Sequence, residues 1–74
     1  MKEFLEKFEE QFDDVVPGSL KAETVFREIE GWSSLTAMLI IAMADAEYDV
    51  TITGAEIKES VTIGDLYNIV TTKK

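Results

Sequence analysis

The amino-acid sequence predicts an all-α fold, a small bundle of three longer helices and one short helix. Apolar side chains recur at spacings of three and four residues, which is the spacing of one helix face. Two Thr-x-x-acid signals of the kind that caps a helix start stand at Thr53 and Thr62. The run with strand-like alternation, residues 50–52, is too short to form a sheet. We therefore expect helices at 2–14, 33–48, 54–59 and 62–71, and no paired β-sheet.

The first predicted helix is amphipathic. The apolar side chains that follow the helical spacing are Phe4, Leu5, Phe8, Phe12 and Val15. Acidic residues and a lysine fill the positions between them, so one side of the helix is polar. An aromatic stripe of this kind is typical of a side facing the core.

A loop is predicted over residues 14–32. Pro17-Gly18-Ser19 interrupts the helical pattern, and Leu20, Val25 and Phe26 are too irregularly spaced for one long helix. We expect the apolar side chains to hold this loop to the core, with a short turn near residues 22–28.

The second helix is predicted because a start signal precedes a long apolar run. Gly31 ends the loop, Ser33 suits the N-cap position, and Ser34 then falls on the first helical turn. The helix has almost no polar residue before Asp45. Because only part of a bundle helix faces inward, we expect it to expose apolar surface to partner proteins.

Residues 50–52 are predicted to be an extended connector to the last two helices. Thr53-x-x-Glu56 is a full capping box and predicts the short third helix. Thr62-x-x-Asp65 has aspartate in place of glutamate and predicts the fourth.

The chain is expected to be a single domain over residues 1–74 with a small core. It contains no cysteine, so no disulfide supplements that core. The helical registers predict that the core consists mainly of Phe4, Leu5, Phe8, Val25, Phe26, Ile40, Ile41, Ile52, Ile57, Ile63, Leu66 and Ile69.

The composition argues against several function classes. Fifteen acidic and seven basic residues give a net charge of -8, which repels nucleic acids and anionic membranes. The absence of histidine and cysteine removes the usual general base and the strongest nucleophile, so we expect no catalytic residue and no enzyme activity. The acids lack the ligand spacing of a calcium loop, which argues against a metal site. With no membrane-length apolar stretch and no signal-peptide pattern, we expect a cytoplasmic protein.

Ser34 is the candidate functional residue. On the first turn of its helix, its hydroxyl would lie beside unpaired backbone N–H groups and the positive end of the helix dipole, where a phosphate ester is favoured. The simpler alternative is a solvated residue with no role beyond the helix start. Ser33 is the second candidate for attachment, because helix boundaries read from sequence can shift by one residue.

The Ser33-Ser34-Leu35 motif before an apolar helix resembles the acyl carrier protein family, whose short helical domains carry phosphopantetheine on the serine of an Asp-Ser-Leu motif. Residues 47–52 and 62–70 also resemble the family's order and spacing, so the resemblance covers nearly the whole chain. Ser33 stands where the family usually has aspartate. The resemblance implies a four-helix carrier domain with phosphopantetheine attached covalently to Ser34.

The resemblance also implies partners and a function. A phosphopantetheinyl transferase would load Ser34, and the cofactor thiol would carry acyl groups as thioesters between acyl-transfer, fatty acid or polyketide synthesis enzymes. The protein would be a monomer, and the third helix, near residues 55–58, would frame a cavity for the acyl chain with the second helix. A carrier-like interaction module that has lost its cofactor is the alternative, because the motif aspartate is replaced.

The second helix departs from the acidic recognition surface of this family. Thr36, Leu39 and Ala46 hold positions that are usually acidic, which favours docking by apolar contact, with acids elsewhere steering the approach. Trp32 is expected either to cover the entrance to the core or to contact a partner. The residues expected to contact partners are Leu35, Met38, Leu39, Ala42 and Asp45.

Overall fold

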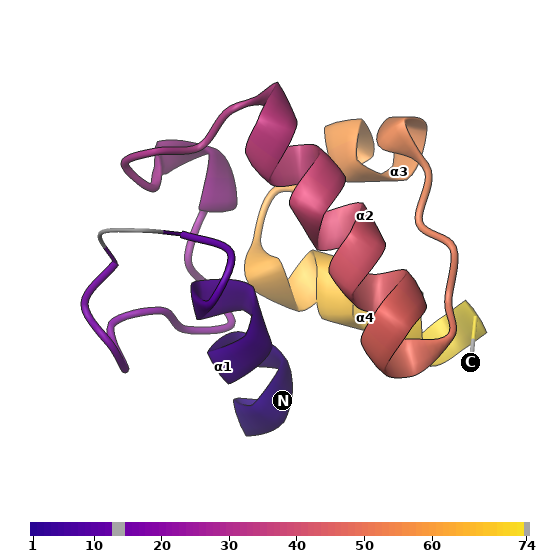
Figure 1. Cartoon of the computed structure of the whole chain (residues 1–74), viewed down its shortest axis with the longest axis horizontal. Coiled ribbons are helices and arrows are strands. Elements are labelled where there is room, and N and C mark those ends of the chain that lie inside the picture. The colour runs from indigo at the N-terminus through magenta and orange to yellow at the C-terminus, as the bar shows by residue number, and fades with distance from the viewer. Residues whose placement is uncertain (13–14, 74) are drawn as a thin grey trace.

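The structure, a computed structural model, describes residues 1–12 and 15–73 and confirms the predicted all-α bundle. Figure 1 shows α2 crossing in front of α4, with α3 and the long α1–α2 loop on opposite sides of α2. The described residues form no strand, although an isolated β-bridge joins Val25 to Thr62. The elements in chain order are α1 (Lys2–Glu9), the 3₁₀ turn η1 (Phe26–Glu28), α2 (Ser34–Tyr48), α3 (Gly54–Glu59) and α4 (Ile63–Lys73).

The core forms where the inner sides of the helices meet the loop. Eight of the twelve predicted core residues are buried: Phe4, Phe8, Phe26, Ile40, Ile52, Ile57, Ile63 and Leu66. The other four are partly buried: Leu5, Val25, Ile41 and Ile69. Five more residues, which are not among those twelve, are buried too: Leu20, Met43, Ala44, Val50 and Val70.

Helix α1 is shorter than the predicted range 2–14. After Glu9 the chain makes a tighter turn, in which the N–H groups of Gln11 and Phe12 donate to the carbonyls three residues earlier, at 3.1 and 3.0 Å. The ring of Phe12 still lies 5.7 Å from that of Phe8, between centroids, so it reaches the core from this turn. The apolar spacing therefore continues after the helix has ended. The last predicted positions, 13–14, lie outside the described residues.

The two predicted capping signals are confirmed. The N–H of Thr53 donates to Glu56 Oε1 at 2.9 Å, and the N–H of Glu56 donates to Thr53 Oγ1 at 3.1 Å. At the start of α4, Asp65 Oδ2 accepts from the N–H groups of Val61 and Thr62, at 2.9 and 3.0 Å. These backbone hydrogen bonds, that of Thr62 first, hold the pKa of Asp65 below its ordinary value because they stabilise the carboxylate.

The α1–α2 loop is fastened to α3 and α4. The guanidinium of Arg27 donates to the carbonyls of Ser60, Ile57 and Lys58 at 2.6, 2.7 and 2.8 Å, and so supplies donors to the end of α3. Near the start of α4, the N–H of Gly64 donates to the carbonyl of Ala22 at 2.8 Å. A Cβ at this glycine would lie 3.1 Å from that oxygen, so a larger residue would require the oxygen to shift by a few tenths of an ångström. The predicted turn near residues 22–28 is realised as η1.

Candidate functional site at the start of α2

Ser33 is the N-cap of α2, as predicted. Its backbone is extended, and its side-chain oxygen accepts from the N–H of Thr36 at 3.4 Å. The Thr36 hydroxyl lies 3.3 Å from that of Ser33 and donates to the carbonyl of Gly31 at 3.0 Å. Gly31 has a φ of 96°, a left-handed conformation that favours glycine. This polar cluster fixes the junction between loop and helix.

Ser34 is the first residue of α2, and its side chain is exposed. Within the described part of the chain, its hydroxyl makes no side-chain hydrogen bond. Backbone N–H groups of a first helical turn have no partner within the helix, and Ser33 satisfies only that of Thr36. The first turn of α2 contains no acidic residue. A phosphodiester on Ser34 therefore fits this site, because its negative charge would meet free N–H donors and the positive end of the helix dipole.

The side of α2 turned away from the core is apolar. Leu35, Met38 and Leu39 are 67%, 65% and 40% exposed, and they follow one another at helical spacing. Ala42 and Asp45 are exposed further along the same stripe, which we call the outer face of α2. The structure thus brings together, as a surface, all five residues expected to contact partners.

Three positions of α2 were expected to correspond to acidic residues of the acyl carrier family, and one of them does not lie on the outer face. Leu39 and Ala46 are exposed, whereas Thr36 is only 6% exposed and belongs to the capping cluster. Thr36 cannot meet a partner directly, so its side chain has a structural role. This role could have been predicted from the sequence, because Thr36 stands three residues after the N-cap, where the backbone N–H meets the capping side chain.

A family profile described as a phosphopantetheine attachment site matches residues 2–70, a range that includes Ser34. The chain belongs to the phosphopantetheine-binding carrier family. Carriers of this family hold phosphopantetheine covalently and are not enzymes themselves, in agreement with the sequence-based prediction. No curated protein and no solved structure matches the chain.

Two further properties of this carrier concern possible ligands and membranes. Across residues 1–12 and 15–73, no group of three acidic side chains is placed to hold a metal ion. None of the helices described has the length and apolar character needed to cross a membrane.

Trp32 covers part of the carrier's core beside the site. The indole is partly buried, and its ring lies 4.8 Å from that of Phe26 and 6.3 Å from that of Phe12, between centroids. These contacts favour the first of its two expected roles, that of covering the core.

Two hollows flank the outer face of α2. One, of about 490 Å³, is lined by the start of α2, by Glu30 and Gly31 of the loop, and by Gln11 and Phe12 after α1. The other, of about 350 Å³, is lined by the middle of α2 and by Thr51 of the connector. Sequence reasoning missed the first hollow, because its walls come from three separate segments of the carrier.

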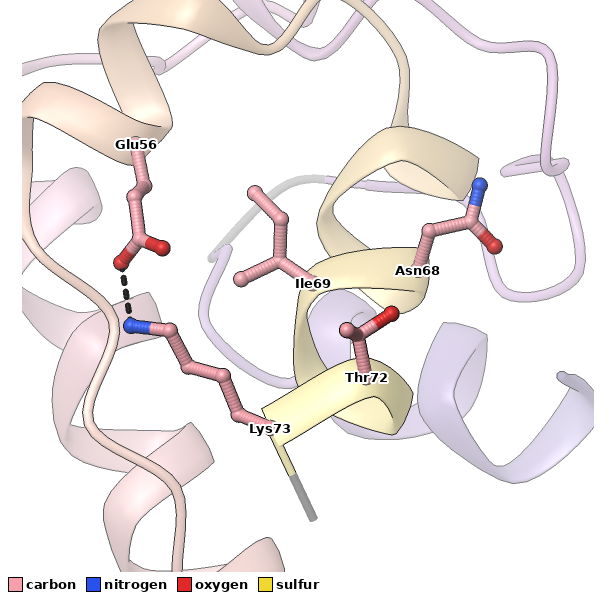
Figure 2. A pocket seen from close by; sticks show the side chains of 5 residues that line it. All are labelled: Glu56, Asn68, Ile69, Thr72 and Lys73. Carbon is pink, nitrogen blue, oxygen red and sulfur yellow. Dashed lines mark hydrogen bonds and ion pairs between the residues drawn. The ribbon is translucent and has the colours of Figure 1, made fainter.

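A third hollow, of about 230 Å³, lies between α3 and α4 (Figure 2). Its floor is formed by Ile69. At its edge, Lys73 Nζ lies 2.6 Å from the carboxylate of Glu56 and donates to the Thr51 carbonyl at 2.8 Å. The ion pair, with the hydrogen bonds of Thr53, holds the pKa of Glu56 below its ordinary value. These charged groups fasten α4 to α3. The cavity that the family resemblance implies would lie between α2 and α3, and none of these three hollows is lined by both helices.

Proposed function

We propose that this carrier transports acyl groups as thioesters on a phosphopantetheine arm attached to Ser34, in fatty acid, related lipid or polyketide biosynthesis. The observation that carries the proposal is the exposed hydroxyl of Ser34 on the first residue of α2, while the neighbouring Ser33 is engaged in capping. The same helix start accommodates the negative charge of a phosphodiester.

The proposed loading step uses coenzyme A as the donor. Ser34 Oγ attacks the phosphorus on the pantetheine side of the pyrophosphate, so an Oγ–P bond forms, a P–O bond breaks and adenosine 3′,5′-bisphosphate leaves. The chain contains no histidine, so a group of the transferase, or water, takes the serine proton. When attached, the arm supplies a terminal thiol that holds the acyl group as a thioester.

The chain's own contribution is position. The hydrogen bonds among Ser33, Thr36 and Gly31 hold the helix start, so that Ser34 projects its hydroxyl from a fixed junction. The outer face of α2, from Leu35 to Asp45, would be the surface that the phosphopantetheinyl transferase and the acyl-transfer or synthase enzymes contact. Its exposed apolar side chains support this assignment, because burying them would favour association.

Incubation with coenzyme A, magnesium and a broad-specificity phosphopantetheinyl transferase tests the proposal. Intact mass should show one phosphopantetheine adduct, and peptide mapping should place it on Ser34. Ser34→Ala should abolish loading while leaving the far-UV helical signal unchanged, because this exposed side chain contributes little packing.

Ser33→Ala is the matched control and should still be loaded. Loading that survives in Ser34→Ala and disappears in Ser33→Ala would move the attachment site to Ser33. Persistent absence of an adduct, despite an active transferase, would support the alternative of an interaction module without cofactor.

A further inference from the structure

The larger hollow beside α2 lies next to the proposed attachment site. Both sequence neighbours of Ser34, Ser33 and Leu35, line it, and Leu39 continues the same wall one helical turn later. Gln11 and Phe12, which follow α1, and Glu30 of the α1–α2 loop also line it. We call this hollow the arm groove.

The second hollow beside α2 is further from the attachment point along the helix. Its first lining residue is Met38, more than one turn after Ser34, and neither neighbour of Ser34 belongs to it. An arm attached to Ser34 begins beside the arm groove. Because the arm is tethered, binding there is intramolecular, and even weak contacts act at a high effective concentration.

The lining of the arm groove matches the chemistry of pantetheine. Leu35 and Leu39 offer apolar walls, and the Phe12 ring is held in place by Phe8 and Trp32. The part of pantetheine nearest the phosphate carries two geminal methyl groups, which suit such walls.

Two polar side chains of the groove can accept hydrogen bonds. Glu30 supplies a carboxylate, and the side-chain Nε2 of Gln11 donates to the Lys7 carbonyl at 3.1 Å, which leaves the amide oxygen to accept. Pantetheine offers one hydroxyl and two amide N–H groups as donors. The groove therefore contains acceptors for these donors and apolar walls for the methyl groups.

We propose that the phosphopantetheine arm, once attached, rests in the arm groove, on the side of α2 nearest α1 and the loop. This inference rests on the proposed attachment at Ser34. In this position the arm covers Leu35 and Leu39 of the outer face and leaves Met38, Ala42 and Asp45 free. A partner enzyme can therefore dock on these three residues without first displacing the arm.

Nuclear Overhauser contacts in the loaded protein test the placement. The geminal methyl protons of the arm should show contacts to the Leu39 methyl groups and the Phe12 ring. Contacts to the methyl groups of Met38 and Ala42 instead, or no contacts with the protein, would overturn the inference. Intact mass is recorded on the same sample. Without a mass gain at Ser34, the proposed function itself fails, whereas a loaded protein whose arm makes no contact in the groove overturns only the groove.

A matched pair of surface variants provides a second test that does not rely only on the assignment of resonances. Leu39→Gln removes an apolar wall of the groove and should abolish the contacts between arm and Phe12. Met38→Gln makes the same change on the other side of the outer face and should retain them. Changes on the outer face are expected to slow the transferase, so both variants are loaded to completion at Ser34, verified by intact mass, before contacts are compared. Retained contacts in Leu39→Gln, or equal losses in the two variants, would overturn the proposal.

Discussion

The two adjacent serines at the start of α2 have different roles. Ser33 uses its oxygen to accept the Thr36 N–H, whereas the hydroxyl of Ser34 projects from the first helical residue. The aspartate that this family usually has in place of Ser33 can cap a helix in the same way. The replacement therefore retains the cap and removes a negative charge beside the proposed phosphodiester.

Replacement of Ser33 by alanine should lower the free energy of unfolding by about 1 kcal/mol, because the Thr36 N–H loses its capping acceptor. Urea unfolding followed by circular dichroism measures the change, with Ser34→Ala as the control that retains the cap. Equal stability of Ser33→Ala and the wild type would show that the capping bond contributes nothing measurable.

At Asp65, the backbone hydrogen bonds predict a pH-dependent contribution to stability. The folded-state pKa is below the ordinary value of 3.8, so the stabilisation is present above that value and is lost as the pH falls through the folded pKa. The wild type should therefore exceed Asp65→Asn in unfolding free energy at neutral pH, and the difference should shrink below about pH 4. Urea titrations across this range measure it, and Glu59→Gln, at an exposed carboxylate, controls for net charge. A difference independent of pH would contradict the assignment.

Some features of helix α2 could be predicted from the sequence and others could not. Its start was predictable because capping is a local property of Gly31, Ser33 and the residues after them. Its inner side was predicted only in part: Ile40 was expected in the core and is buried, whereas the burial of Met43 and Ala44 was not expected. The reason is that nearly every residue before Asp45 is apolar, so no polar stripe marks the outside. The structure buries Met43 and Ala44 and exposes Leu35 and Met38, a choice made by tertiary packing.

If partners dock on the outer face, Met38→Glu should lower the catalytic efficiency of loading by about tenfold, because apolar burial at the interface is lost. Val61→Glu is the matched control, since Val61 is an exposed apolar residue outside α2, at 51%. The rate should also fall only modestly as ionic strength rises. Faster loading of Met38→Glu, or a steep loss of rate in moderate salt, would indicate acidic recognition instead.

Taken as a whole, the molecule combines a small apolar core with a net charge of -8. The seven basic residues offset fewer than half of the fifteen acids. One of them, Lys7, joins α1 to α2, because its Nζ lies 2.8 Å from Glu47 Oε1. The four helices were predictable from local signals. The arm groove was not, because it needs Phe12 and Leu39 to meet across the fold, and periodicity within a segment does not show how segments pack.

Because like charges repel across the whole surface, added salt should raise the melting temperature. An increase from low ionic strength to about 0.15 M shortens the Debye length to about 8 Å and screens this repulsion. Calorimetry in potassium chloride measures the shift. Magnesium chloride at the same ionic strength is the control, and a similar shift is expected if screening is the cause. A melting temperature that falls with salt would show that attractive ion pairs outweigh the repulsion.

Trp32 provides the protein with an optical signal of its own. It is the sole tryptophan of the chain, it stands two residues before Ser34, and its ring lies against Phe26. The fluorescence emission of an indole ring depends on how far the ring is exposed to water, and this ring is only partly buried. Fluorescence of the unlabelled protein should therefore report events at the α2 start in real time, including attachment of the arm and arrival of an enzyme.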